Sequence, residues 1–188
     1  MPVAKAYQLL SDDGVKEYAI YFQDDDGGYE ARYTCSADEN LSLSPGDKIK
    51  VTGYIDFFIK KHIVCTKLEK EEGFLYLANS FDVSDMLGTE DIKAKQNMYV
   101  CVEGLTVEEL DGRTIIFEDI DNESYSFDAS KDNQIVHLKI ESDVEAINQG
   151  INSNIQELKS GDKINVTGIL QVHTNAIYIL VLSIEKVS

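Results

Sequence analysis

The chain has 188 residues, 43% of them hydrophobic, which is enough apolar material for one large or two small globular domains. Its net charge is −17, and such a field repels nucleic-acid phosphates and anionic membranes at long range. No apolar run approaches the roughly 18 residues that span a bilayer, and the first residues do not follow the pattern of a signal peptide. We therefore expect a soluble protein, either cytoplasmic or exported with its signal removed.

Three strands are expected at the start of the chain, over Val3–Leu10, Val15–Gln23 and Tyr29–Cys35. Apolar and polar residues alternate in these stretches, which is typical of half-buried strands. Acidic stretches that contain glycine separate them, and such stretches favour tight turns. With alternate residues facing the core, Tyr21 and Arg32 point outward.

One segment of the chain occurs twice. Gly46–Gly53 recurs as Gly161–Gly168, and seven of the eight residues are identical. Each copy opens with a Gly-Asp pair, which favours a turn, and continues as an alternating strand. A glycine inside a strand marks a bulge or a sharp bend, which a small barrel needs in order to close, so we expect one at the final glycine of each copy. The expected partner strands are Ile63–Leu68 and Ala176–Ile184.

The second copy follows a segment, residues 74–97, that is not rich in glycine, serine or proline, so we expect a packed connector there. The first three strands of this copy are expected over Met98–Val107, Arg113–Asp119 and Ser124–Ala129. An insertion of about residues 130–159 comes next. It begins with a strand at Ile135–Ile140 and continues as a helix capped by Ser142.

The order of strands and the repeated Gly-Asp-Lys-Ile strand resemble the oligonucleotide/oligosaccharide-binding (OB) fold, and in particular tandem OB-like domains of uncharacterised bacterial proteins. The residues that carry the resemblance are Leu43–Gly53 with Ile63–Lys70, and Leu158–Gly168 with Ala176–Lys186. The resemblance implies a mainly β protein of two five-stranded Greek-key barrels. The first is a short barrel at 1–73 without a clear helix, and the second, at 98–188, has a helix inserted between strands 3 and 4. OB folds hold many kinds of ligand, so the resemblance leaves the ligand open.

Strands 2 and 3 of an OB barrel usually present the ligand-binding face. In the second copy, the strands expected above place no basic and no aromatic side chain on that face. The outward residues would be Thr114, Ile116, Glu118, Ser124, Ser126 and Asp128. Such a face is a poor surface for an oligonucleotide, because it offers neither stacking nor charge neutralisation.

The first copy has a better surface on its fourth and fifth strands. Residues 48–70 contain six lysines and two acidic residues, and Tyr54 and Phe58 share a face with two of those lysines. Exposed aromatic rings beside lysines can stack on bases, sugars or a peptide, and they also occur at interfaces between domains. The ligand-binding candidates are Lys48, Lys50, Tyr54, Phe58, Lys60, Lys61, His62, Tyr21 and Arg32.

No motif for catalysis, a metal or a cofactor is present in the sequence. The three cysteines have no C-x-x-C spacing and are expected to be buried and apolar in character, although one disulfide remains open. The three histidines stand in separate elements, and His137, in an apolar strand, is expected to be structural. We find no phosphate loop and no nucleophile elbow. We therefore expect no enzyme, no metal and no cofactor.

The leading hypothesis is a non-catalytic binding protein whose partner is a protein, a peptide or an oligosaccharide. The net charge of −17 disfavours nucleic acid. One alternative is single-stranded nucleic-acid binding through the basic and aromatic patch of the first copy. Another is a hydrolase with a metal held by acidic residues. The sequence does not decide the ligand, the compartment or the oligomeric state.

Overall fold

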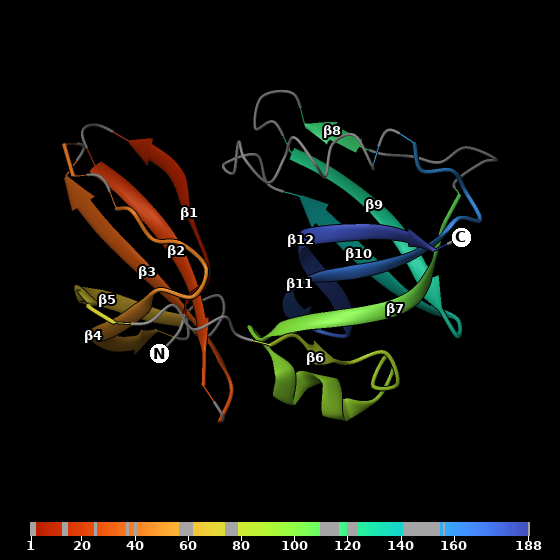
Figure 1. Ribbon diagram of the computed structural model, residues 1–188, viewed down its shortest axis with the longest axis horizontal. Helices are drawn as coiled ribbons and strands as arrows, with labels where there is room; N and C mark the ends of the chain where they lie inside the picture. The colour runs from red at the N-terminus through yellow and green to blue at the C-terminus, as the bar shows by residue number, and fades with distance from the viewer. Residues whose placement is uncertain are drawn as a thin grey trace. The chain divides into compact units, whose positions relative to one another are not determined.

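A computed structural model describes most of the chain, and its described residues are 3–12, 15–24, 26–36, 38–39, 41–56, 62–73, 79–109, 117–119, 124–140, 155 and 157–187. The chain forms two compact units (Figure 1). Unit 1 comprises Met1–Asn79 with Asn97–Tyr99, and unit 2 comprises Ser80–Gln96 with Val100–Ser188. The fold is mainly β, as predicted, and each unit contains one sheet with the strand order of an OB barrel. No helix in the described part of the chain is long and apolar enough to cross a membrane.

The sheet of unit 1 has five strands in the order β1-β2-β3-β5-β4. Only β3 and β5 pair in parallel, and the other neighbours are antiparallel, which is the OB pattern. The strands are β1 (Val3–Asp12), β2 (Val15–Gln23), β3 (Gly28–Ser36), β4 (Lys48–Asp56) and β5 (His62–Glu71).

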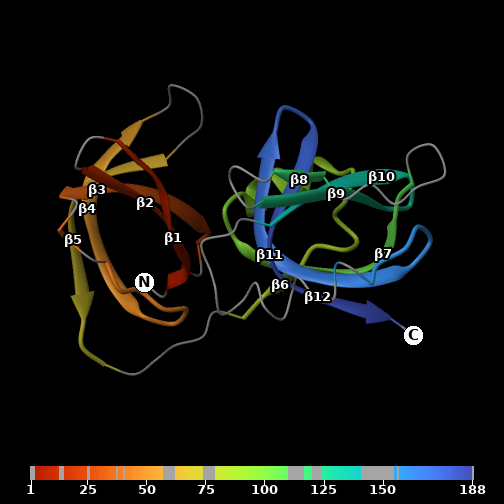
Figure 2. The same ribbon diagram turned by 90° about the horizontal axis from the view of Figure 1, so that it is seen from above.

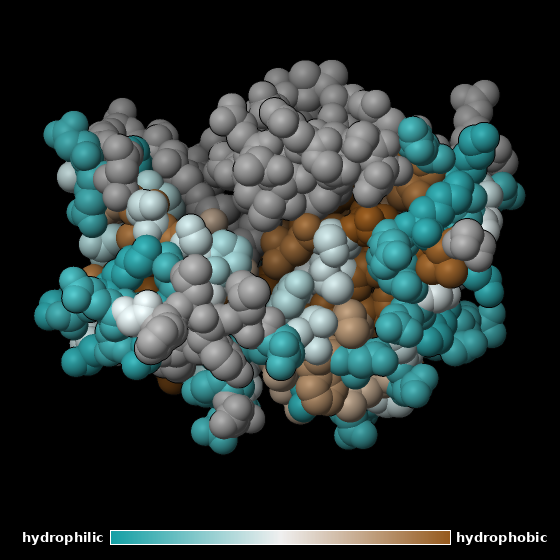
Figure 3. Space-filling view, viewed as in Figure 1, coloured by the Kyte–Doolittle hydropathy of each residue, from teal (hydrophilic) through white to brown (hydrophobic). Residues whose placement is uncertain are grey.

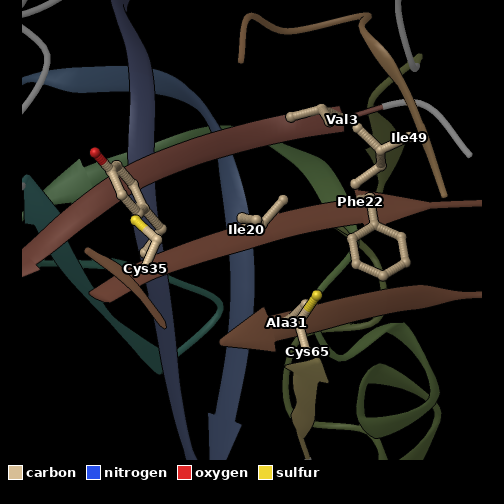
Figure 4. Close-up of a cluster of buried hydrophobic side chains, with 8 residues drawn as sticks. Val3, Ile20, Phe22, Ala31, Cys35, Ile49 and Cys65 are labelled. Carbon is tan, nitrogen blue, oxygen red and sulfur yellow. The ribbon is translucent and has the colours of Figure 1, made fainter. Parts of the chain in front are cut away.

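The inner faces of these strands form one hydrophobic core (Figure 4). Every strand of the sheet contributes to it, because alternate residues along a strand point to the same side. The labelled members are Val3, Ile20, Phe22, Ala31, Cys35, Ile49 and Cys65. Cys35 and Cys65 are buried free thiols, and Cys101 in unit 2 is free as well, so the possible disulfide does not form.

The sheet of unit 2 closes into a ring, which Figure 2 shows from above. Its order is β7-β11-β12-β10-β9, and β9 pairs back to β7 through Thr106–Ser130 and Val107–Ala129. The ring strands are β7 (Tyr99–Val107), β9 (Ser124–Lys131), β10 (Gln134–Ile140), β11 (Lys163–His173) and β12 (Ala176–Val187). Two short strands, β6 (Phe81–Asp82) and β8 (Phe117–Asp119), add to the edges, and η1 (Glu90–Lys95) is a 3-10 helix.

The repeated Gly-Asp turn has the same structural role in both units. Asp47 accepts a hydrogen bond from the backbone N–H of Ser44 and forms an ion pair with Lys70, with Oδ2 at 2.7 Å from each nitrogen. The same turn exchanges two backbone hydrogen bonds with Val3, and this contact joins β1 to the start of β4. In unit 2 the equivalent contacts are Asp162 with Lys159 and Lys186, and Gly161 and Asp162 with Val107. The repeat is therefore explained by barrel closure and carries no information about a ligand.

The bulge predicted at each strand-interior glycine is confirmed. The register of β4 against β5 shifts between Thr52 and Gly53, and that of β11 against β12 shifts between Thr167 and Gly168. A Cβ atom on Gly53 would lie 2.1 Å from the Val64 carbonyl oxygen. The backbones approach so closely at both bulges that only glycine fits.

The strands of the second barrel differ from the prediction. The second and third barrel strands are β9 and β10, because β10 pairs in parallel with β12 as strand 3 pairs with strand 5 in an OB fold. Residues 134–140 are thus a barrel strand and not part of an insertion. A two-residue turn at Asp132 and Asn133, both with positive φ, joins β9 to β10, as is typical of a type I′ hairpin. The segment 117–119, expected to belong to strand 2, is β8 and pairs with the other side of β9.

The expected helix between the third and fourth barrel strands falls mainly on residues 141–154 and 156, outside the described part of the chain. Ile155 and Leu158, from the same stretch, are buried. The segment expected to be a packed connector has described residues 79–97, and its side chains Val83 and Ile92 are buried. From Ser80 to Gln96 this segment belongs to unit 2.

Equivalent positions of the repeat differ in burial. Ile169 and Leu170 on β11 have no exposed surface, whereas Tyr54 and Ile55 on β4 are 61% and 50% exposed. In unit 2, β7 pairs along β11, and the Val172 N–H donates to the side chain of Gln96 at the end of η1. In unit 1, β4 is an edge strand of the described sheet, and backbone hydrogen bonds link Val3 of β1 to Gly46 and Asp47 in the turn that precedes β4. This difference explains why Ile55 is half exposed, whereas Leu170 at the equivalent position of unit 2 is buried.

Candidate functional site

Three of the four described lysines of the basic patch predicted in unit 1 form ion pairs with neighbouring carboxylates. Ion pairs join Lys48 to Glu71 at 2.9 Å and Lys67 to Glu69 at 2.8 Å, in addition to the pair made by Lys70 in the Gly-Asp turn. The cross-strand register also places Lys50 opposite Glu69. The positive charge of the described lysines is therefore largely offset by carboxylates on β5 and by Asp47.

The aromatic and histidine candidates of this patch have different positions. Tyr54 is exposed, as predicted, and His62 is half-buried and opposite Asp56 in the β4–β5 register. Phe58, Lys60 and Lys61 lie outside the described residues. Among the described residues of the predicted patch, Tyr54, Lys48 and Lys50 are exposed, and Lys48 is paired with Glu71.

Tyr21 and Arg32 do not form an open binding face. Tyr21 was placed outward by the alternation of β2, but its exposed fraction is 0%, so that prediction is wrong. The Arg32 guanidinium lies 2.7 Å from Glu30, whose side chain is fully buried, and 3.6 Å from Glu17. Arg32 is therefore committed to neutralising a buried carboxylate, which would otherwise be costly.

The same face of unit 1 is covered near the end of β2 by backbone from later in the chain. The Gln23 side chain donates to the Asn79 carbonyl at 3.3 Å and accepts from the Tyr99 N–H at 2.7 Å. A Cβ atom on Gly28 would lie 2.3 Å from the backbone of Asn97. Sequence alternation cannot reveal this cover, because it reports two faces of a strand and not what packs on each.

Unit 2 presents an open outer face on β9 and β10. Along β10 the exposed or half-exposed residues alternate with the buried Val136, Leu138 and Ile140, and β9 shows the same alternation around Phe127 and Ala129. The outward residues are Ser126, Asp128, Ser130, Ile135, His137 and Lys139. This face is the one that OB folds commonly use for ligands.

A hollow of about 550 Å³ lies on this face. Its lining includes Ile135, His137 and Lys139 from β10, Asp128 from β9 and Tyr178 from β12. Ile135 is 53% exposed and Tyr178 is 37% exposed. Figure 3 shows hydrophobic residues gathered on the side of unit 2 where β11 and β12 run in Figure 1. The exposed Ile135 and Tyr178 in its lining allow the hollow to take a flat, partly apolar group.

His137 and Tyr178 form a stacking pair in the hollow. Their ring centroids are 4.8 Å apart and the ring planes differ by 30°. The parallel register of β10 and β12 places the two residues side by side, and the antiparallel register of β9 and β10 places Asp128 on the other side of His137. The His137 Nδ1 atom lies 2.7 Å from Asp128 Oδ1, which orients the imidazole ring. A planar ligand would find a fixed aromatic surface here.

The rim of the hollow is acidic. Glu108 and Glu109, which follow β7, line it together with Asp128, and Lys139 is the lysine in the lining. Glu108 accepts a hydrogen bond from the Ser130 hydroxyl. Glu109 Oε2 accepts one from the Ser160 hydroxyl at 3.1 Å. Neighbouring hydroxyl groups thus hold both glutamates at the rim.

Sequence reasoning did not find this site, because it assigned His137 to an inserted strand and did not consider Tyr178. The Lys-Asp-Asn-Gln stretch at 131–134 was the available signal, since Asp-Asn between two alternating strands favours a two-residue hairpin. With that hairpin in place, His137 belongs to barrel strand 3 and faces outward. Among the residues that the structure describes, no three His, Cys, Asp or Glu side chains are grouped so as to hold a metal ion.

No protein-family model and no curated protein matches the chain. Similar solved structures include a murine DNA-binding protein bound to double-stranded DNA, at 11% identity and a TM-score of 0.42, over 100% of this chain and 96% of that chain. The p204 HINb domain is 9% identical with a TM-score of 0.35, over 100% and 97% of the two chains. The wild-type single-stranded DNA-binding protein from Thermus aquaticus is 11% identical with a TM-score of 0.32, over 100% and 89%. At such identities the similarity concerns the fold alone.

Proposed function

We propose that this protein binds single-stranded nucleic acid and that the bases lie on the outer face of β9 and β10 in unit 2. The observation that carries the proposal is the stacking pair of His137 and Tyr178, set in a hollow of about 550 Å³ on that face. Every base has a π-face, so stacking on an aromatic side chain tolerates different sequences and contributes about 1–3 kcal/mol per base. Catalysis is not part of the proposal.

The sequence favoured a protein, peptide or oligosaccharide as the partner over nucleic acid, and this preference is corrected here. The murine protein and the Thermus aquaticus protein with similar structures are DNA-binding proteins. The expected preference for a protein or glycan partner also depended on the wrong choice of barrel strands 2 and 3. The outer face formed by those strands had no aromatic side chain. With β9 and β10 as barrel strands 2 and 3, that face includes His137 and neighbours Tyr178.

The charge of the chain predicts an unusual salt dependence. Proteins that neutralise phosphates lose affinity steeply as salt increases, because binding releases counterions. This protein carries −17, and its hollow has an acidic rim, so stacking must supply most of the affinity. We expect a shallow dependence on salt, since added ions also screen the repulsion between protein and phosphates. Binding through the lysines of unit 1 would instead give a steep decrease.

Fluorescence anisotropy with labelled mixed-sequence single-stranded DNA and RNA tests the proposal. Tyr178→Ala removes one ring of the stacking pair, and we expect affinity to fall about 5- to 100-fold. Tyr54→Ala is the matched control, because it removes an exposed tyrosine from a strand of unit 1. Circular dichroism of both variants checks that the fold is retained.

Three results are informative. A loss with Tyr178→Ala and none with Tyr54→Ala supports the site on unit 2. The reverse pattern, with a steep salt dependence, would move the site to the patch of unit 1 that contains Lys50 and Tyr54. An absence of binding to DNA and to RNA at low salt would refute the proposed function.

A further inference from the structure

The hollow of unit 2 is lined by charges that repel phosphate. Three carboxylates, those of Glu108, Glu109 and Asp128, face one ammonium group, that of Lys139. A phosphate placed among them would meet net repulsion. A nucleic-acid strand that lies on this face therefore presents a base to the hollow and keeps its backbone outside.

The carboxylates supply hydrogen-bond acceptors in fixed positions. Glu108 uses one oxygen to accept from Ser130, and Asp128 uses one at 2.7 Å from the His137 ring nitrogen. Glu109 is held in the same way by a serine hydroxyl. An ionised carboxylate has about four lone-pair sites, so each group retains the capacity to accept hydrogen bonds from a ligand. The hollow thus combines a surface for stacking with a rim of acceptors.

The four bases differ in what they offer to such a rim. Guanine presents two adjacent donors, N1–H and the N2 amino group, which match the two oxygens of one carboxylate. Adenine and cytosine place an acceptor nitrogen beside their amino group, and thymine and uracil place carbonyl oxygens on both sides of their N–H. A carboxylate repels those acceptors.

We propose that the hollow selects guanine, which stacks on His137 and Tyr178 while its donor edge meets the acidic rim. This inference rests on the proposed function. It also gives a reason for acidic side chains on a face that binds nucleic acid. The negative rim weakens contact with the backbone of any sequence, and it favours the one base whose pairing edge consists of donors.

Competition binding with single-base variants of one strand tests this inference. The probes are oligothymidylates whose central nucleotide is guanine, inosine, adenine, cytosine or thymine, measured against the wild-type protein in sodium buffer. Inosine is the decisive comparison, because it retains the ring and N1–H of guanine and lacks only the N2 amino group. We expect the guanine strand to bind about 5- to 100-fold more tightly than the others.

A triple variant, Glu108→Gln/Glu109→Gln/Asp128→Asn, replaces the rim with amides of the same size. We expect it to bind the guanine and inosine strands equally. Glu103→Gln is the control, since it removes an exposed carboxylate of β7 that does not line the hollow, and it should retain the preference. If all five strands bind the wild type within about twofold, or another base binds best, the inference is wrong and the proposed function stands. If no strand binds, the proposed function fails.

Discussion

The bulge at Gly53 makes a strong prediction about stability. A Cβ atom on this residue would lie 2.1 Å from the Val64 carbonyl oxygen, 2.9 Å from its carbon and 3.0 Å from Ile63 Cγ2. Two of these three neighbours are backbone atoms of β5, which cannot move aside as a flexible side chain can. Gly53→Ala must therefore push β5 away from β4 or distort the bulge.

The expected loss follows from the size of this displacement. Relieving the overlap requires a shift of about 1 Å, and forcing extra atoms into a packed region costs about 1–3 kcal/mol. A strand that moves this far also weakens adjacent ladder hydrogen bonds, each contributing about 0.5–1.5 kcal/mol. We expect Gly53→Ala to lower the unfolding free energy of unit 1 by about 2–4 kcal/mol. For a unit of this size that corresponds to a decrease in Tm of about 10 °C or more.

Urea denaturation followed by tyrosine fluorescence and by circular dichroism measures this loss, since the chain has no tryptophan. Gly27→Ala is the matched control. A Cβ atom on Gly27 meets nothing within 4 Å and its φ lies outside the left-handed region, so the substitution should be neutral or stabilise unit 1 by up to about 1 kcal/mol. If the two variants unfold within about 0.5 kcal/mol of each other, the close approach does not explain the glycine.

Two further predictions concern charged groups of unit 1. Arg32→Ala leaves the buried Glu30 carboxylate without its guanidinium partner, and we expect a loss of about 3 kcal/mol in urea denaturation. Lys67→Ala, which breaks an exposed pair, should cost less than about 1 kcal/mol; equal losses would show that the Arg32 pair is not special. Burial raises the pKa of Asp47, but hydrogen bonds from Lys70 and the Ser44 N–H and the charge of Lys70 outweigh it, so the pKa lies below its ordinary value of 3.8. Because the pKa is lowered in the folded state, its stabilisation is present above about pH 4 and is lost as the pH falls further. The unfolding free energy of Asp47→Asn should therefore fall less than that of the wild type below pH 4, and parallel curves would contradict this.

Local sequence was sufficient for the fold class and for the repeated turn and bulge. The Gly-Asp pair, the alternating strand and the glycine seven residues after the first predict a turn and a bend from backbone chemistry alone. Both occur at Gly46–Gly53 and at Gly161–Gly168. Such features depend on residues close together in the chain, and for this reason they can be inferred without knowledge of the fold.

Strand identity in the second barrel was decided by long-range pairing. The stretches at 117–119 and at 134–140 both read as strands, and alternation does not state which of them joins the strand at 124–131 in the barrel. Pairing of β10 with β12 settles the choice, and it places His137 beside Tyr178 across 41 residues of sequence. A one-element error in strand order changes the whole composition of the outer face.

The charge of unit 1 likewise depends partly on local sequence and partly on the tertiary structure. The sequence determines how many lysines lie in residues 48–70, and only the cross-strand register of β4 and β5 decides that Glu71 pairs with Lys48 and that Glu69 lies opposite Lys50. Likewise, alternation predicts which residues of β2 share a face, but it does not predict that Tyr21 is buried. Periodicity along a strand is local, whereas burial and charge pairing are properties of what the tertiary structure places opposite each residue.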